Sequence, residues 1–157
     1  MIERILMATD FSDCSNKALD YAVDWAETFK ADLYLLHVFE LPFYSHTGVT
    51  PARQREVRDW IKELKEKESK RLNSLTEKLK KRAVKVQPLL KEGKPFIEII
   101  KTAGAIRTGL IVMGTHGRTG VERLVLGSVA ERVVRLAPCP VMTVRGLRLG
   151  RKRARKE

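Results

Sequence analysis

Two segments of the sequence carry side chains that could bind a ligand, and each follows a short apolar run. One has hydroxyl and acidic side chains, and the other combines glycines with hydroxyl and basic side chains. The first is Thr9-Asp10-Phe11-Ser12, which comes after residues 5–8. The second follows residues 110–113 and contains, in order, Gly114, His116, Gly117, Arg118, Gly127 and Ser128. Glycine lets a ligand approach backbone N–H groups closely, and the start of a helix favours an anion. These residue types favour a phosphate-binding loop, to which Arg118 adds positive charge.

The same residues also have ordinary structural explanations. The glycines are compatible with a loose turn, and Ser128 is a typical helix cap. Asp10 is suited to ribose or to a metal-bound water, but also to capping the first helix, and His116 is suited to facing either phosphate or solvent. The established nucleotide fingerprints do not decide the question, because the sequence has no G-x-x-x-x-G-K-S/T and no G-x-G-x-x-G after a strand.

The elements that must position these residues alternate between two hydrophobic periods. Short apolar runs typical of buried strands occur at residues 5–8, 33–39, 84–89, 110–113 and 141–144. Helical spacing of apolar residues occurs from Ser12 or Asp13, over 52–82, from Pro95 and over 128–136. This repeated strand–helix alternation predicts an α/β fold with an open, doubly wound parallel sheet. In such sheets ligands bind beyond the carboxyl ends of the strands.

The helix predicted over 52–82 is long and highly charged. Its apolar stripe is interrupted by Glu68 and consists of Val57, Ile61, Leu64, Leu72, Leu75 and Leu79. The charged residues around that stripe indicate a solvated helix face. Trp25 and Trp60 both lie on helical apolar stripes, so we expect them to be packing residues rather than platforms for a base.

Composition and charge exclude several classes of protein. A chain of 157 residues is one ordinary domain. No apolar run approaches the roughly 18 residues that span a bilayer, and the N-terminal residues lack the layout of a signal peptide. Cys14 and Cys139 form neither a disulfide framework nor a Cys-x-x-Cys motif. We therefore expect a cytoplasmic domain over residues 1–146, followed by a basic, disordered tail over 147–157.

The spacing Gly114-x2-Gly117-x9-Gly127-Ser128 resembles the ATP-binding signature of the universal stress protein family. The resemblance covers about residues 1–145 and rests on several motifs in the same order. They are Ala8-Thr9-Asp10-Phe11-Ser12, Leu36-His37-Val38, Met113-Gly114-Thr115-His116-Gly117, Gly127-Ser128-Val129-Ala130-Glu131 and the segment 137–144. The basic tail lies outside the resemblance.

The resemblance implies a Rossmann-like sheet with strand order 3-2-1-4-5. It further implies that adenine and ribose lie near Thr9, Asp10 and Val38. The triphosphate would lie on Gly114, Gly117, Gly127, Ser128 and Val129, bordered by Met113 and His116. Mg²⁺ or Mn²⁺ would then be held mainly by phosphate oxygens and water, since His37, His46 and His116 are too scattered to suggest a protein metal site. Family members also commonly pair as homodimers through the strand matching 141–144.

The resulting expectation is a stress-response regulator that binds ATP, ADP or AMP and hydrolyses ATP slowly at most. No general base for phosphoryl transfer can be identified, so no catalytic residue is assigned. Two alternatives remain open at this stage. The Arg- and Lys-rich residues 151–156 are suited to weak, salt-sensitive binding of nucleic acid or another polyanion. The domain could also be an interaction module that holds no nucleotide.

Overall fold

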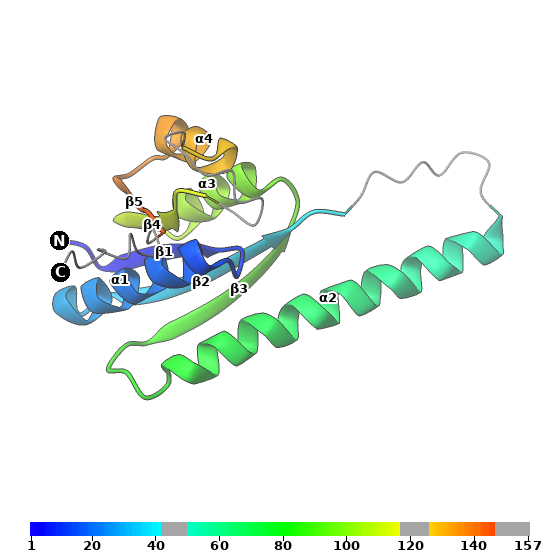
Figure 1. Cartoon of the computed structure of the whole chain (residues 1–157), viewed down its shortest axis with the longest axis horizontal. Coiled ribbons are helices and arrows are strands. Elements are labelled where there is room, and N and C mark those ends of the chain that lie inside the picture. The colour runs from blue at the N-terminus through cyan, green and yellow to red at the C-terminus, as the bar shows by residue number, and fades with distance from the viewer. Residues whose placement is uncertain (42–49, 117–125, 147–157) are drawn as a thin grey trace, which may run out of the picture.

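The computed structural model describes residues 1–41, 50–116 and 126–146 and contains a five-stranded sheet, in the order β3-β2-β1-β4-β5 (Figure 1). Every pair of neighbouring strands is parallel. The strands are β1 (Arg4–Thr9), β2 (Asp32–Phe39), β3 (Val86–Glu92), β4 (Leu110–Gly114) and β5 (Val141–Val144). The helices are α1 (Asp13–Phe29), α2 (Pro51–Leu79), α3 (Pro95–Ala105) and α4 (Ser128–Leu136). The predicted fold class and strand order are therefore confirmed.

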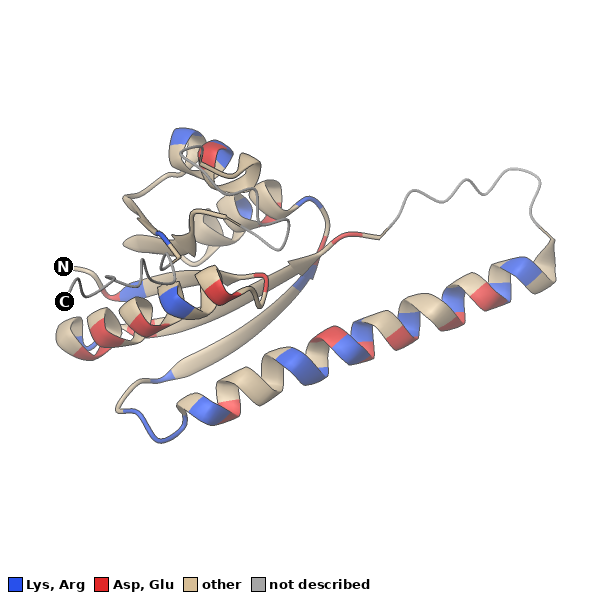
Figure 2. Cartoon of the chain, viewed as in Figure 1, with Lys and Arg blue, Asp and Glu red and all other residues tan. Residues whose placement is uncertain are grey.

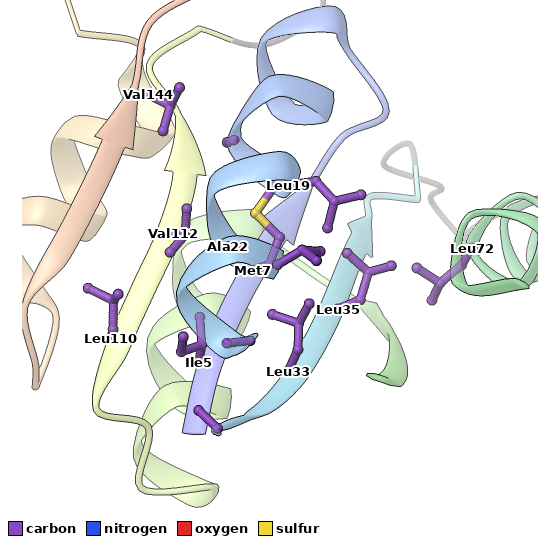
Figure 3. Packing of buried hydrophobic residues seen from close by; sticks show 14 residues of the cluster. Ile5, Met7, Leu19, Ala22, Leu33, Leu35, Leu72, Leu110, Val112 and Val144 are labelled. Atoms are coloured by element: carbon purple, nitrogen blue, oxygen red, sulfur yellow. The ribbon is translucent and has the colours of Figure 1, made fainter. Parts of the chain in front are cut away.

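Two hydrophobic clusters, one on each face of the sheet, explain why the strands are apolar on both sides. Ile5, Met7, Leu33 and Leu35 pack with α1 and with Leu72 of α2. Figure 3 shows this side, where Leu72 points toward Leu35 and Ala22 of α1 covers the strands. The alternate strand residues, among them Leu6 and Leu36, pack with α3 and α4 on the opposite face.

The strand order brings the two candidate segments together. β1 lies between β2 and β4, and Ala8 is paired with Met113 in the parallel register. The segments after Thr9 and after Met113 therefore leave the sheet side by side. Because the chain moves to opposite sides of β1 at this point, this edge is the topological switch point where doubly wound sheets bind ligands.

Two predicted element boundaries were wrong, at strand β3 and at helix α2. β3 extends over 86–92 rather than 84–89. β3 is an edge strand whose last two residues, Lys91 and Glu92, are exposed. Its backbone continues to pair with β2 after the apolar residues have ended. Helix α2 ends at Leu79 rather than at 82. Arg82 lies beyond it and forms ion pairs with Asp24 and Glu27 of α1. The hydrogen bond from Arg82 holds the pKa of Glu27 below its ordinary value.

The packing prediction for the tryptophans was also wrong. Trp60 is 44% exposed, because only Glu68 and Leu72 of α2 are buried and the N-terminal part of this helix extends past the sheet (Figure 1). Charged residues follow one another along the whole of α2 (Figure 2). Trp25 is exposed on α1, where its ring lies 5.3 Å from that of Phe29. Within the described residues, none of the helices combines the length and the apolar character needed to cross a bilayer.

Gly114 allows α1 to approach the end of β4. A Cβ at this position would lie 2.9 Å from Cys14 Sγ, 3.1 Å from the Cys14 carbonyl carbon and 3.2 Å from Ser15 N. Two of these three atoms belong to backbone, so the first turn of α1 would have to move. The Cys14 thiol is buried and donates to the Val144 carbonyl oxygen at 3.2 Å, which also holds α1 against β5.

Substitution of Gly114 by Ala should lower the free energy of unfolding by about 1–3 kcal/mol, the usual cost of overpacking. The matched control is Gly104→Ala in α3, where a Cβ would meet nothing within 4 Å. That change should raise stability by about 0.4–1 kcal/mol, because alanine restricts the unfolded chain. Urea unfolding followed by circular dichroism measures both effects, and equal stability of the two variants would contradict the packing argument.

Truncation of Leu72 to Ala should cost about 2–4 kcal/mol, because the side chain is only 2% exposed and joins α2 to the sheet. Trp60→Ala removes a larger side chain from the same helix but should change stability by no more than about 0.5 kcal/mol. Thermal and urea unfolding of both variants provides the comparison. A larger loss for Trp60→Ala would show that the outer part of α2 is packed in solution.

Candidate functional site

A cavity of about 260 Å³ opens at the carboxyl ends of β1 and β4, beside the first turn of α4. Nine of the predicted site residues line it, namely Thr9, Asp10, Val38, Met113, Gly114, His116, Gly127, Ser128 and Val129. The other two, Gly117 and Arg118, lie outside the described residues. The structure thus brings together, around one cavity, all the candidate residues that it describes.

The loop after β1 is held by its own side chains. Thr9 Oγ1 accepts from Phe11 N at 3.1 Å and lies 3.2 Å from Ser15 Oγ. Asp10 Oδ1 accepts from Ser12 N at 3.0 Å, which closes a tight turn. Ser12, not Asp10, is the N-cap of α1, and its hydroxyl accepts from Ser15 N at 3.2 Å. The capping alternative for Asp10 is therefore excluded, and the residue lines the cavity.

The first turn of α4 presents backbone donors to the cavity. The N-cap of this helix is Gly127, and no side chain among the described residues caps it. Ser128 is the first helical residue and is exposed, so the alternative explanation that it caps the helix is excluded. The first N–H groups of a helix have no partner within the helix, and Ser128, Val129 and Ala130 line the cavity. Their amides and the Ser128 hydroxyl are suited to an anion.

Gly127 is required because a side chain at this position would collide with the protein's own backbone, not because a ligand must come close. Its N–H donates to the Thr115 carbonyl oxygen at 2.7 Å, and a Cβ would lie only 2.8 Å from that same oxygen. The close contact fixes the start of α4 against the end of β4. At both Gly114 and Gly127, then, the missing side chain leaves room for the protein's own backbone, and the cavity follows from that packing.

His116 contributes a polar atom whose partner is missing. Its Nδ1 lies 2.8 Å from Thr115 Oγ1. Its Nε2 is buried and has no hydrogen-bond partner within the part of the chain that the structure describes. Buried polar atoms in proteins are nearly always paired, and this residue lines the cavity. The ring is thus placed to meet a polar ligand.

Sequence reasoning missed the apolar wall of the cavity. This wall consists of Ala8 and Leu36 from the sheet with Pro95 and Ile99 from α3. Its strand members could have been found from the alternation of β2, since Leu36 and Val38 lie on one face and His37 on the other. Pro95 and Ile99 belong to α3, and the local sequence does not show that this helix packs beside the cavity.

The described residues contain no group of three or more His, Cys, Asp or Glu side chains that could hold a metal ion. Cys139, which precedes β5, is half-buried, and burial raises the pKa of its thiol. The cavity lining combines the first turn of α4 with the acidic residue Asp10 and with the apolar residues Ala8, Leu36, Pro95 and Ile99.

Comparisons with known proteins agree with this architecture. The model of the universal stress protein family matches residues 1–145. The universal stress protein MJ0531 of Methanocaldococcus jannaschii is 37% identical, over 92% of this chain and 83% of its own length. YxiE of Bacillus subtilis, also a universal stress protein, is 34% identical, over 92% of this chain and all of its own.

The solved structure of MJ0577, a universal stress protein of the same archaeon, is also similar. It has a TM-score of 0.73 and 30% identity, and the alignment covers 92% of this chain and 96% of that one. The match to the family model spans nearly the whole described fold, including every wall of the cavity. The chain belongs to the universal stress protein family, whose members are stress-response proteins.

Proposed function

We propose that this chain is a cytoplasmic regulator that binds ATP, or its products ADP and AMP, in the cavity between β1, β4 and α4. The observation that carries the proposal is the convergence of nine predicted nucleotide-site residues on that one cavity. Two members of the family with the same fold, each 20% identical to this chain, were solved with cAMP and with AMP. Those ligands are properties of those proteins, and they indicate the class of ligand to test here.

The residues of the cavity fit an adenine nucleotide. Three groups would face the phosphates: the start of α4, which no described side chain caps, the Ser128 hydroxyl, and His116 Nε2, which has no hydrogen-bond partner among the described residues. Thr9 and Asp10 would lie at the ribose, and Val38 would offer its backbone to adenine beside the apolar wall. A divalent cation, Mg²⁺ or Mn²⁺, would screen the phosphate charge and be held mainly by phosphate oxygens and water.

The same geometry favours regulation over catalysis. Fast phosphoryl transfer requires a positioned nucleophile and a group that orients it. Among the described residues that line the cavity, Asp10 is the only acid, and one of its oxygens already accepts from Ser12 N. We therefore assign no catalytic residue and expect slow ATP hydrolysis at most. The alternative role of residues 151–156 in binding nucleic acid falls on residues outside the described part of the chain.

Ser128→Ala should weaken ATP binding about 10–150-fold, because it removes a hydrogen bond to a charged oxygen, worth roughly 1.5–3 kcal/mol. It should change adenosine binding little. Asp10→Ala, in contrast, should weaken ATP and AMP alike. Calorimetric titration with Mg²⁺ or Mn²⁺ measures the affinities.

Ser74→Ala is the matched control, since Ser74 is exposed on α2 and does not line the cavity. The proposed function fails if the wild-type protein binds no adenine nucleotide at millimolar concentration. If ATP binds but Ser128→Ala behaves like Ser74→Ala, the phosphates lie elsewhere.

We further propose a homodimer formed through β5. This strand is at the sheet edge, and Val141, Met142 and Thr143 are half-buried. The carbonyl oxygen of Pro140 accepts from Ile111 N of β4, and that of Val144 accepts from Thr115 N directly after β4. Because backbone groups alternate in direction along a strand, the N–H of Thr143 faces the free edge.

Thr143→Pro should therefore yield monomers, because it removes an edge donor without breaking the β4–β5 ladder. Thr143→Val keeps the N–H and should remain dimeric. Light scattering should give twice 17.9 kDa for the wild-type protein and for Thr143→Val, and 17.9 kDa for Thr143→Pro. A monomeric wild-type protein at micromolar concentration would exclude this dimer.

A further inference from the structure

A buried polar cluster lies behind the cavity, on the face of the sheet covered by α1 and α2. His37 of β2 is 4% exposed. Its Nδ1 lies 2.8 Å from the Thr9 carbonyl oxygen, and its Nε2 lies 3.0 Å from Glu68 Oε2. Glu68 is itself buried and is the residue that interrupts the apolar stripe of α2. The imidazole thus joins the end of β1 to the long helix.

Arg71 and Phe11 complete the cluster. Arg71 Nη1 lies 3.4 Å from Glu68 Oε2, and its guanidinium carbon lies 4.3 Å from the centre of the Phe11 ring. That ring is also 4.4 Å from the ring of His37. Phe11 has a φ of 63°, which a large L residue adopts only when its surroundings hold it there. The side chains from α2 and β2 therefore support the strained residue next to Asp10.

Each of the two ring nitrogens of His37 faces an oxygen atom, and each of these contacts needs a proton to be a hydrogen bond. The Thr9 carbonyl oxygen can only accept, so Nδ1 carries hydrogen. The contact between Nε2 and Glu68 Oε2 needs one proton between the two atoms. Arg71 Nη1 donates to the same oxygen, so we place Glu68 as the acceptor and the proton on the imidazole. Without that proton, a nitrogen lone pair would face a buried carboxylate oxygen. The contact would then be repulsive, and water could not relieve it.

We propose that the His37–Glu68 pair is a proton-dependent positioning device, which couples the docking of α2 to the loop that carries Asp10 and so to the adenosine end of the nucleotide site. This inference rests on the proposed nucleotide function. Among the described residues, Glu68 of α2 is a charged group in contact with His37, and Arg71 pairs with that same carboxylate. Asp10 follows Thr9, whose carbonyl oxygen is the other partner of the ring. On β3 the register partner of His37 is the uncharged Leu90.

The direction of the pH effect follows from the proton count. The docked state holds the shared proton, so its stability is complete at lower pH and is lost as the pH rises through the titration of His37. Affinity for adenosine should fall in the same direction. Glu68→Gln changes this behaviour, because the amide can donate to an unprotonated Nε2 and the extra proton is no longer required.

The test compares wild type, Glu68→Gln and Glu66→Gln at about pH 6 and about pH 9, the range in which a histidine can be titrated. Glu66 lies on the same helix but is exposed, which makes it the matched control. Adenosine is the probe, because it carries no phosphate that titrates in this range. Binding is followed by NMR, and the ¹⁵N signals of the His37 ring report its protonation.

Wild type and Glu66→Gln should lose at least about fivefold in adenosine affinity between the two pH values, the lower end of usual coupling between sites. Glu68→Gln should change less than about twofold. An equal pH effect in Glu68→Gln and wild type would overturn the proposal, and so would a neutral His37 ring at the lower pH.

Hydrogen exchange separates this proposal from the proposed function. At about pH 6 the amides of Phe11 and Ser12 should exchange at least about tenfold faster in Glu68→Ala than in Glu66→Ala. Equal exchange in the two variants would overturn the coupling between α2 and the loop. If wild type binds neither adenosine nor ATP, the nucleotide function fails, while the exchange rates still decide whether Glu68 holds the loop.

Discussion

Parallel hydrogen bonding of β1 to both β2 and β4 is the constraint on which the rest of the structure depends. It places the carboxyl ends of β1 and β4 next to each other, and both strands end at the cavity. The first turn of α1 then packs closely against the end of β4, and the start of α4 packs closely against Thr115. Gly114 and Gly127 make this possible, since a side chain at either position would overlap backbone atoms of α1 or of the Thr115 carbonyl. Fold stability and site geometry are thus set by the same contacts.

Much of the fold could be predicted from hydrophobic period alone, because the central strands β1, β2 and β4 are buried on both faces and each helix has an apolar stripe. The order of the strands came from the resemblance, since sequence spacing does not state which strands are neighbours. The edges of elements were less predictable. At β3, backbone pairing continues through Lys91 and Glu92, whose side chains carry no apolar signal.

The candidate site was predictable to the extent that its residues follow strands directly. The roles of individual residues were harder to predict, because they depend on contacts between distant parts of the chain. Ser128 has the residue type of a cap, yet it is the first residue of the helix and Gly127 is the N-cap. Glu68 shows in the sequence only as an interruption of a stripe, while its partner His37 lies 31 positions away in the chain. Trp60 has helical spacing, yet it is 44% exposed, because the burial of a helix residue depends on which elements pack against it.

The two edges of the sheet differ in their chemistry. At the β3 edge, Pro88 lacks an N–H and is exposed, and exposed Lys91 and Glu92 follow it. Proline and charge both oppose the addition of another strand. The β5 edge has three consecutive half-buried residues and no charge within the strand. A sheet with one receptive edge would pair with one other copy through that edge and leave only β3 edges exposed. Any association through strands would then stop at two chains instead of continuing into a filament.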